Sequence, residues 1–238
     1  MRTYHSQEQN LLLAAVPPML IGRMLDESEL VTLPLGQVVH EADAPLDYVY
    51  FPTTSIVSLL HTTRTGASAE IAVVGNEGMV GISVIMGGNT TPSRAVVQGA
   101  GHAYRTKSSA LKTEFASGSV LHNVLLLYTQ ALMTQMTQTA VCYRHHSLDQ
   151  QLCRWLLLSL DRAMSIKLEM TPDLIADMLG VPREGVKEIA EKLQFAGLIH
   201  YDGGTITVLD RPRLELRACE CYSVVKKESE RLFSPYRL

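Results

Sequence analysis

Short runs of β-branched and aromatic residues dominate residues 31–103, where Gly, Pro, Asn and Asp separate one run from the next. Many short strands at regular spacing predict an antiparallel barrel or jelly roll. Gly66 and Gly75 occupy positions at which hairpin turns are expected. The strands are expected over residues 31–33, 38–39, 48–51, 56–60, 69–74 and 94–98.

The pattern changes at about Ser117. From there to about His146 proline is absent, Gly118 is the only glycine, and apolar residues recur at spacings of three and four, which places them on one helix face. A helix of roughly thirty residues is ~40 Å long, more than a small domain needs to cover its own core. We therefore interpret residues 117–146 as a dimerisation helix whose apolar seam packs against its twin, with an internal core helix as the alternative. The seam consists of Leu121, Leu125, Tyr128, Leu132 and Met136.

A second helix is expected over residues 147–164. Its apolar side includes the only tryptophan of the chain, Trp155, which we interpret as a core anchor. Arg154, Asp161 and Arg162 are expected to face water. The apolar positions are Leu152, Trp155, Leu156, Leu157 and Leu160.

The next segment has a helix-turn-helix pattern. Thr171 precedes a proline and is a candidate N-cap for a short helix over residues 173–179. Gly180 follows as a sharp turn, and a second amphipathic helix is expected at about residues 182–194. Two short helices joined by a glycine-containing turn form a helix-turn-helix.

A hairpin follows directly. Residues 198–201 and 205–208 are apolar or β-branched and flank Asp202, Gly203 and Gly204, which have the chemistry of a tight turn. A helix-turn-helix followed by a hairpin is a winged helix.

A winged helix reads DNA with polar side chains on the N-terminal half of its second helix, which enters the major groove. An arginine can bond guanine in a bidentate manner, and a carboxylate can accept from the cytosine amino group. We expect Thr171 and the hairpin tip at Gly203 to meet phosphates, which fix register without reading sequence. The outward positions of the second helix are Arg183, Glu184, Lys187 and Glu188.

Two glutamates leave an alternative open. Glu188 and Glu191 would repel phosphates, which gives weight to a solvated charged helix in a winged helix that binds protein. The rival function is therefore a ligand-sensing or protein-interaction module that does not bind DNA. Loss of sequence preference on Arg183→Ala, with folding intact, would separate DNA recognition from this rival.

Composition narrows the class of protein. Of the 238 residues, 46% are hydrophobic, enough for two modest cores. The net charge is −3, so any DNA-binding surface must come from local placement of Lys and Arg. The apolar run over residues 11–21 is interrupted by Pro17 and Pro18 and is too short to span a bilayer, so we expect a buried helix followed by a turn and no membrane partner. No Walker-type loop, nucleophile elbow or His-Glu metal signature is present, and we do not expect an enzyme.

The cysteines are too few for the disulfide framework of a small secreted protein, which favours a reducing cytoplasm. Cys219 and Cys221 form a C-x-C pair with only His200 and distant cysteines as partners, so we expect buried thiols and no metal. A redox-sensing role for the thiols of this pair is an alternative. His145 and His146 are adjacent on a helix and point in different directions, so they do not chelate as a pair. The four cysteines are Cys142, Cys153, Cys219 and Cys221.

Three segments carry a resemblance to a known family. Residues 180–186, with Arg183-Glu184, are similar to the start of a recognition helix. Residues 36–51 look like the first strands of a cyclic-nucleotide-binding-type β-roll, and residues 75–95 fall where its phosphate-binding cassette lies. With the order of β-roll, long helix and winged helix, the chain resembles the Crp/Fnr superfamily of bacterial transcription regulators over nearly its whole length.

The resemblance implies an α+β protein with an effector-type β-roll (a double-stranded β-helix or jelly roll) over residues 1–116, the dimerisation helix over 117–146 and a winged-helix DNA-binding domain over 147–238. It implies a homodimer that binds a two-fold symmetric site on double-stranded DNA, with RNA polymerase as a further partner. Arg183 and Glu184 match the family's base-contacting pair. Glu188 stands where the cAMP receptor protein has an arginine, so the target sequence should differ.

The effector domain departs from the cAMP-binding pattern. Where the family binds cyclic phosphate and ribose with Gly-Glu and Arg-Ser pairs, this chain has Gly81-Ile82 and Ser93-Arg94. A ribose hydroxyl left unsatisfied costs ~1–3 kcal/mol, so we do not expect control by cAMP, although Arg94 could still meet another anion. The absence of cysteine before Cys142 excludes the iron–sulfur sensors of the family. Any effector should bind between the β-roll and the long helix, at Gly81, Ser93, Arg94 and Thr137 or Gln138.

Overall fold

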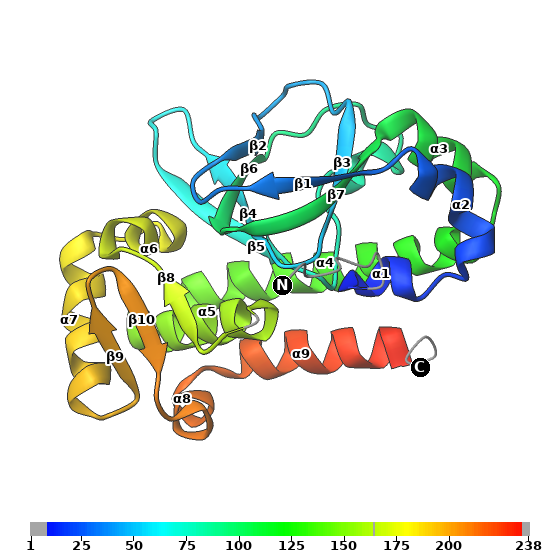
Figure 1. Ribbon diagram of the computed structural model, residues 1–238. Helices are drawn as coiled ribbons and strands as arrows, with labels where there is room; N and C mark the ends of the chain where they lie inside the picture. Colours follow the sequence, from blue (N-terminus) through cyan, green and yellow to red (C-terminus); the bar gives the residue numbers. More distant parts are fainter. Residues whose placement is uncertain (1–8, 164, 235–238) are drawn as a thin grey trace.

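A computed structural model describes residues 9–163 and 165–234 of the chain and has the predicted α+β architecture (Figure 1). A β-roll is followed by a long helix, α4, and then by a winged helix with its own small sheet. The predicted outer ends of the domains at residues 1 and 238, and the predicted end of the second helix at Met164, lie outside the described residues. No helix in the part of the chain that the structure describes has both the length and the apolar character needed to span a bilayer.

The N-terminal apolar run forms two helices where one was expected. α1 (Leu11–Ala14) ends before the two prolines, and α2 (Pro18–Asp26) begins at the second of them because proline is favoured in the first turn of a helix. Asn10 caps α1 through its side-chain oxygen, and its amide donates to the carbonyls of Pro52 (2.9 Å) and Gly78 (2.8 Å). This buried side chain fastens the N-terminal segment to the β-roll.

The β-roll consists of two antiparallel sheets, in the strand orders β1-β7-β3 and β2-β6-β4-β5. All six predicted strands are present, and β7 is an additional strand that extends beyond the segment in which strands were expected. Gly66 lies in the β4–β5 turn as predicted, with φ +87°. The prediction of a hairpin at Gly75 is wrong. The chain does turn there, but the segment after the turn does not pair with β5; it forms an isolated bridge between Val80 and Tyr50 of β3. The strands are β1 (Glu29–Leu33), β2 (Val38–His40), β3 (Tyr48–Pro52), β4 (Ile56–Thr62), β5 (Ser68–Val74), β6 (Arg94–Gly99) and β7 (Gly101–Lys107).

The long helix is shorter at its start than predicted. A separate helix, α3 (Ser108–Ala116), comes first. Gly118, with φ +71°, separates it from α4, which runs from Val120 to His145. The prediction that the apolar seam of α4 packs against a second copy of the chain is wrong, because the seam packs against the β-roll of the same chain. Four of its five residues are buried in the core of the β-roll of the same chain, and Met136 packs against that core. Tyr128 of this seam also donates a hydrogen bond to the carbonyl of Met79 (2.9 Å).

A second face of α4 is covered by the C-terminal helix, α9 (Glu220–Phe233), which runs alongside it (Figure 1). Gln130 of α4 donates to the carboxylate of Glu228 on α9 at 3.2 Å. The face of α4 away from both the β-roll and α9 is exposed.

The second helix, α5 (Leu148–Arg162), begins at a capping box formed by Ser147 and Gln150. Trp155 is buried as predicted. The expectation that Arg154 and Arg162 face water is wrong: Arg154 is 2% exposed and donates to the hydroxyl of Thr139 (2.6 Å), whereas Arg162 forms an ion pair with Glu77 (2.6 Å). The β-roll and α4 cover the side of α5 that the sequence pattern assigned to solvent.

The winged helix comprises β8 (Lys167–Glu169), α6 (Pro172–Leu179), α7 (Arg183–Phe195), β9 (Ile199–Asp202), β10 (Thr205–Val208) and α8 (Arg211–Arg217). Its core is continuous with that of α5 and with apolar residues of the roll, among them Ile56 and Val73. The core of the winged helix therefore extends into the β-roll, which also has a second core of its own.

The junction between the roll and α5 contains a buried carboxyl group. Glu70 of β5 is 4% exposed and accepts a hydrogen bond from the indole of Trp155 at 3.1 Å. Burial raises the pKa of this carboxyl from 4.5 to about 7, although Arg154 and Arg162 act in the opposite direction.

Glu70→Gln should reduce the pH dependence of stability. Because the folded state holds a proton on Glu70 that the unfolded state releases at lower pH, this group lowers the free energy of unfolding as pH rises from 4.5 to about 7. Urea unfolding at several pH values across this window, followed by Trp155 fluorescence, should show a smaller decrease in the variant. Glu29→Gln, at an exposed carboxyl, is the control. Identical pH dependence in the wild type and Glu70→Gln would contradict the assignment.

Candidate nucleic-acid interface

The turn of the helix-turn-helix is shaped by Gly180. This residue ends α6 with φ +65°, a conformation that L side chains rarely adopt. A Cβ atom at this position would also lie 3.1 Å from the carbonyl oxygen of Ser68, in the β-roll. The predicted turn is therefore confirmed, and it is packed directly against the roll.

The N-terminal half of α7 presents the predicted polar residues to solvent. The apolar side of the helix, with Val186 and Leu193, is buried in the domain core. Arg183 is the first residue of α7 and pairs with Asp173 at 3.1 Å, with both side chains 60% exposed. An ion pair this exposed contributes little to stability, so the guanidinium is free to exchange partners. The exposed residues include Arg183, Glu184, Lys187 and Glu188.

These residues form two polar faces on α7. The face that contains Arg183 and Lys187 lines a groove together with Tyr201 of the wing. On the other face, Glu188 forms an ion pair with Lys192 at 2.6 Å, and this hydrogen bond lowers the pKa of the glutamate. The repulsion of phosphates expected from Glu188 is therefore offset within the helix.

The wing brings two predicted phosphate contacts together. Gly203 and Gly204 form the tip of the β9–β10 hairpin with φ of +55° and +85°, as a tight hairpin turn requires. The carbonyl of Gly204 accepts from the N–H of Met170 at 2.7 Å, which places the tip beside Thr171 at the start of α6. The third strand of this sheet, β8, pairs with β10 and was not predicted, because three residues are too few for a periodicity signal.

The winged helix is held against the β-roll by Tyr143 of α4. Its hydroxyl lies 3.1 Å from the carbonyl oxygen of Glu70 on β5 and 3.2 Å from that of Met178 on α6. Since one hydroxyl contacts two elements, the position of α6 is coupled to that of β5 through α4.

The predicted effector residues lie in two different surroundings. Gly81, with φ +97°, starts a short 3-10 turn over Ile82–Val84, and Arg94 forms an ion pair with Glu41 at 2.9 Å, near Ser93. Thr137 and Gln138 instead line a groove on the outer side of α4 whose walls are α4 residues alone. Within one chain, Thr137 and Gln138 therefore do not line a common site with Gly81, Ser93 and Arg94.

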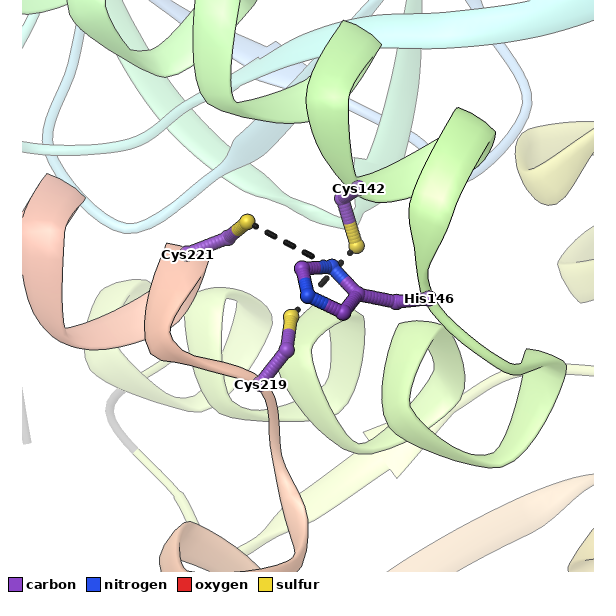
Figure 2. Close-up of side chains that lie close together, drawn as sticks. All are labelled: Cys142, His146, Cys219 and Cys221. Carbon is purple, nitrogen blue, oxygen red and sulfur yellow. Dashed lines mark hydrogen bonds between the residues drawn. The ribbon is translucent and has the colours of Figure 1, made fainter.

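Cys219 and Cys221 are buried as expected, but the histidine beside them is His146 and not His200. Cys142 and His146, at the end of α4, lie beside them (Figure 2). The sulfur and nitrogen atoms that could bind a metal lie within 4.8 Å of one another across these four residues. The sequence signal that could have revealed the cluster is the spacing of Cys142 and His146, which puts both on one helix face.

Two known domain families match the chain. The Crp-like helix-turn-helix domain matches residues 150–217, and the cyclic nucleotide-binding domain matches residues 30–117. Among curated proteins, none matches the chain.

Several solved structures have the same fold. FixK2 from Bradyrhizobium japonicum is 19% identical, with a TM-score of 0.66 over 81% of this chain and 98% of that one. TTHB099, a CRP-family transcriptional regulator from Thermus thermophilus, is 17% identical, with a TM-score of 0.66 over 79% and 96% of the two chains. The c-di-GMP responsive regulator CLP from Xanthomonas campestris is 16% identical, with a TM-score of 0.64 over 82% and 100%.

Thr171→Ala should destabilise the winged helix by about 1 kcal/mol, because the Thr171 hydroxyl caps α6 by accepting from the N–H of Leu174 at 3.2 Å. Thr171→Ser keeps the cap and is the control. Urea unfolding followed by Trp155 fluorescence measures the difference, since Trp155 lies in the core that α5 and the winged helix share. A wild-type unfolding midpoint for the alanine variant would show that the cap does not stabilise this helix.

Proposed function

Because the chain belongs to the Crp/Fnr superfamily of bacterial transcription regulators, we propose that it is a homodimer that binds a two-fold symmetric DNA site through α7. The observation that carries the proposal is the exposed N-terminal half of α7, flanked by the wing tip and by the start of α6. Arg183 and Glu184 would contact base edges, while Thr171 and Gly203 would lie against the phosphates on either side.

The outer face of α4 supports the dimer. Its exposed residues are spaced alternately three and four apart, which is the heptad spacing of a helix seam. Leu126 and Met133, which are 49% and 62% exposed, lie in this row and offer apolar surface to a partner. We assign this face to a second copy of the chain. The stripe consists of Asn123, Leu126, Gln130, Met133, Thr137, Ala140 and Arg144, and Gln130 lies at its border with α9, where it bonds to Glu228.

Pairing of two copies along this stripe would place both recognition helices on one side of the DNA. A two-fold dimer of this kind binds half-sites one helical turn apart, ~34 Å along the duplex. Tyr143 and the shared core would transmit the position of α4 to each winged helix.

We also propose that the β-roll does not respond to cAMP. Ile82 is partly buried against the core of the roll and offers no carboxylate to a ribose hydroxyl. One similar structure, CLP, is described as responsive to c-di-GMP, so the fold is compatible with other effectors. In the dimer, an effector near Arg94 could meet Thr137 or Gln138 of the partner's α4, a contact that one chain alone does not offer.

Arg183→Ala should weaken binding to a preferred duplex by about 1–3 kcal/mol, roughly a fivefold to 150-fold loss, and relax the preference at one base position. The duplex is obtained by selection from a random pool with the wild-type protein, and binding is measured by fluorescence anisotropy. Arg231→Ala is the matched control, because Arg231 is also ion-paired and 62% exposed but lies on α9. Equal binding by both variants, or no duplex enriched with or without cell extract, would favour a protein-interaction module.

Met133→Glu should convert the dimer to a monomer, since two glutamates would face each other across the seam. Sedimentation velocity measures the change in mass. Met86→Glu is the matched control: Met86 is 64% exposed, close to the value for Met133, but lies on the β-roll. A Met133→Glu variant that remains dimeric would move the interface elsewhere on the chain.

A further inference from the structure

Four potential metal ligands converge where α4 meets the start of α9 (Figure 2). Cys142 lies in the last turn of α4 and His146 is the C-cap of that helix, while Cys219 and Cys221 lie at the N-cap and in the first turn of α9. The sulfur atoms of Cys142 and Cys219 are 3.5 Å apart. The sulfur of Cys221 is 3.7 Å from Nδ1 of His146.

These two separations match edges of a zinc tetrahedron, and all four ligand atoms lie within 4.8 Å of one another. With zinc–sulfur bonds of ~2.3 Å and zinc–nitrogen bonds of ~2.0 Å, tetrahedral ligands lie about 3.5–3.8 Å from one another. Three cysteines and one histidine are also a known ligand set of structural zinc sites, and thiolates select zinc over the harder magnesium and calcium ions. We propose that Cys142, His146, Cys219 and Cys221 bind one zinc ion.

The surroundings of His146 support this assignment independently. While Nδ1 faces Cys221, Nε2 lies 3.3 Å from the carboxylate of Glu220. A histidine that binds a metal usually donates its other ring N–H to a carboxylate or a carbonyl, which fixes the tautomer and the ring plane. Gln151 also donates to the backbone carbonyl of His146 at 2.9 Å and holds the end of α4 in place.

The charge near the cluster is also favourable. Zinc bound by three thiolates and a neutral imidazole carries a net charge of −1. The guanidinium of Arg154 is 2% exposed and lies within electrostatic reach of Cys142 and Cys221. Its Nε atom has no hydrogen-bond partner within the described part of the chain. A bound zinc thiolate centre would therefore offer a counter-charge to a buried cation.

The site would join the two ends of the segment that contains the winged helix. Cys142 and His146 directly precede residues 147–218, which contain the winged helix, and Cys219 and Cys221 directly follow them. All four protein ligands are in place and no position is left for a substrate, as in structural zinc sites. Zinc would thus fix the orientation of the DNA-binding domain on α4, a consequence for DNA recognition that rests on the proposed function.

Metal content is the first test, and it requires no DNA. The full-length protein, purified under reducing conditions with zinc in the growth medium, should contain about one zinc per chain by elemental analysis. Cys142→Ala and Cys219→Ala should each lower the content at least tenfold. Cys153→Ala is the control, because Cys153 is a buried thiol outside the cluster. Circular dichroism confirms that each variant is folded.

Two further variants test the site without removing a cysteine. Glu220→Ala changes a largely exposed side chain and should weaken zinc binding about tenfold or more in competition with a chelator, whereas Glu230→Ala on the same helix should not. His146→Cys should still bind, and with Co²⁺ in place of zinc its thiolate charge-transfer absorption should increase.

Three results would overturn the proposal. The first is a reduced protein that binds neither added Zn²⁺ nor Co²⁺ at micromolar concentration. The second is iron with acid-labile sulfide in place of zinc. The third is a Cys142–Cys219 disulfide in protein purified under reducing conditions. Binding of zinc by a protein that enriches no DNA would leave the metal site standing and contradict only the proposed function.

Discussion

The packing of α4 is the constraint on which the rest of the structure depends. One face of the helix completes the core of the β-roll, and a second face is covered by α9. The third face is exposed and has the spacing of a helix seam. A single element can therefore join the effector-type domain, the C-terminal helix and a second copy of the chain. Any shift of α4 relative to the roll would move the other two contacts with it.

The end of α4 controls the placement of the winged helix. Tyr143 contacts β5 and α6 at once, and the chain leaves α4 at His146, where the cysteine cluster lies. Next to it, buried charged and polar groups join β5, α4 and α5, among them Glu70 and Arg154. Buried charges are strongly destabilising when a partner is removed, so this junction favours one arrangement of the domains over a range of them.

Much of the fold could be predicted because its signals are local. The turn chemistry of the wing and the glycine of the helix-turn-helix each lie within a few residues, and the apolar periodicity of α4 lies within one continuous segment. The errors arose where a partner is distant in the chain. Periodicity gives the direction of a face but not its neighbour, so it cannot tell whether the α4 seam packs on the β-roll or on a second copy. The same limit applies to Arg154, whose buried surroundings come from distant elements, and to Cys219, which the whole winged helix separates from Cys142 in the chain.

Hydroxyl-radical footprinting on a duplex selected by the wild-type protein tests the central claim most directly, which is that α4 pairs two copies so that both recognition helices reach one side of the DNA. The account predicts two symmetric zones of protection, their centres about one helical turn apart, on one face of the duplex and appearing together as protein is added. Protection of a single half-site at saturation, or protection without two-fold symmetry, would contradict it.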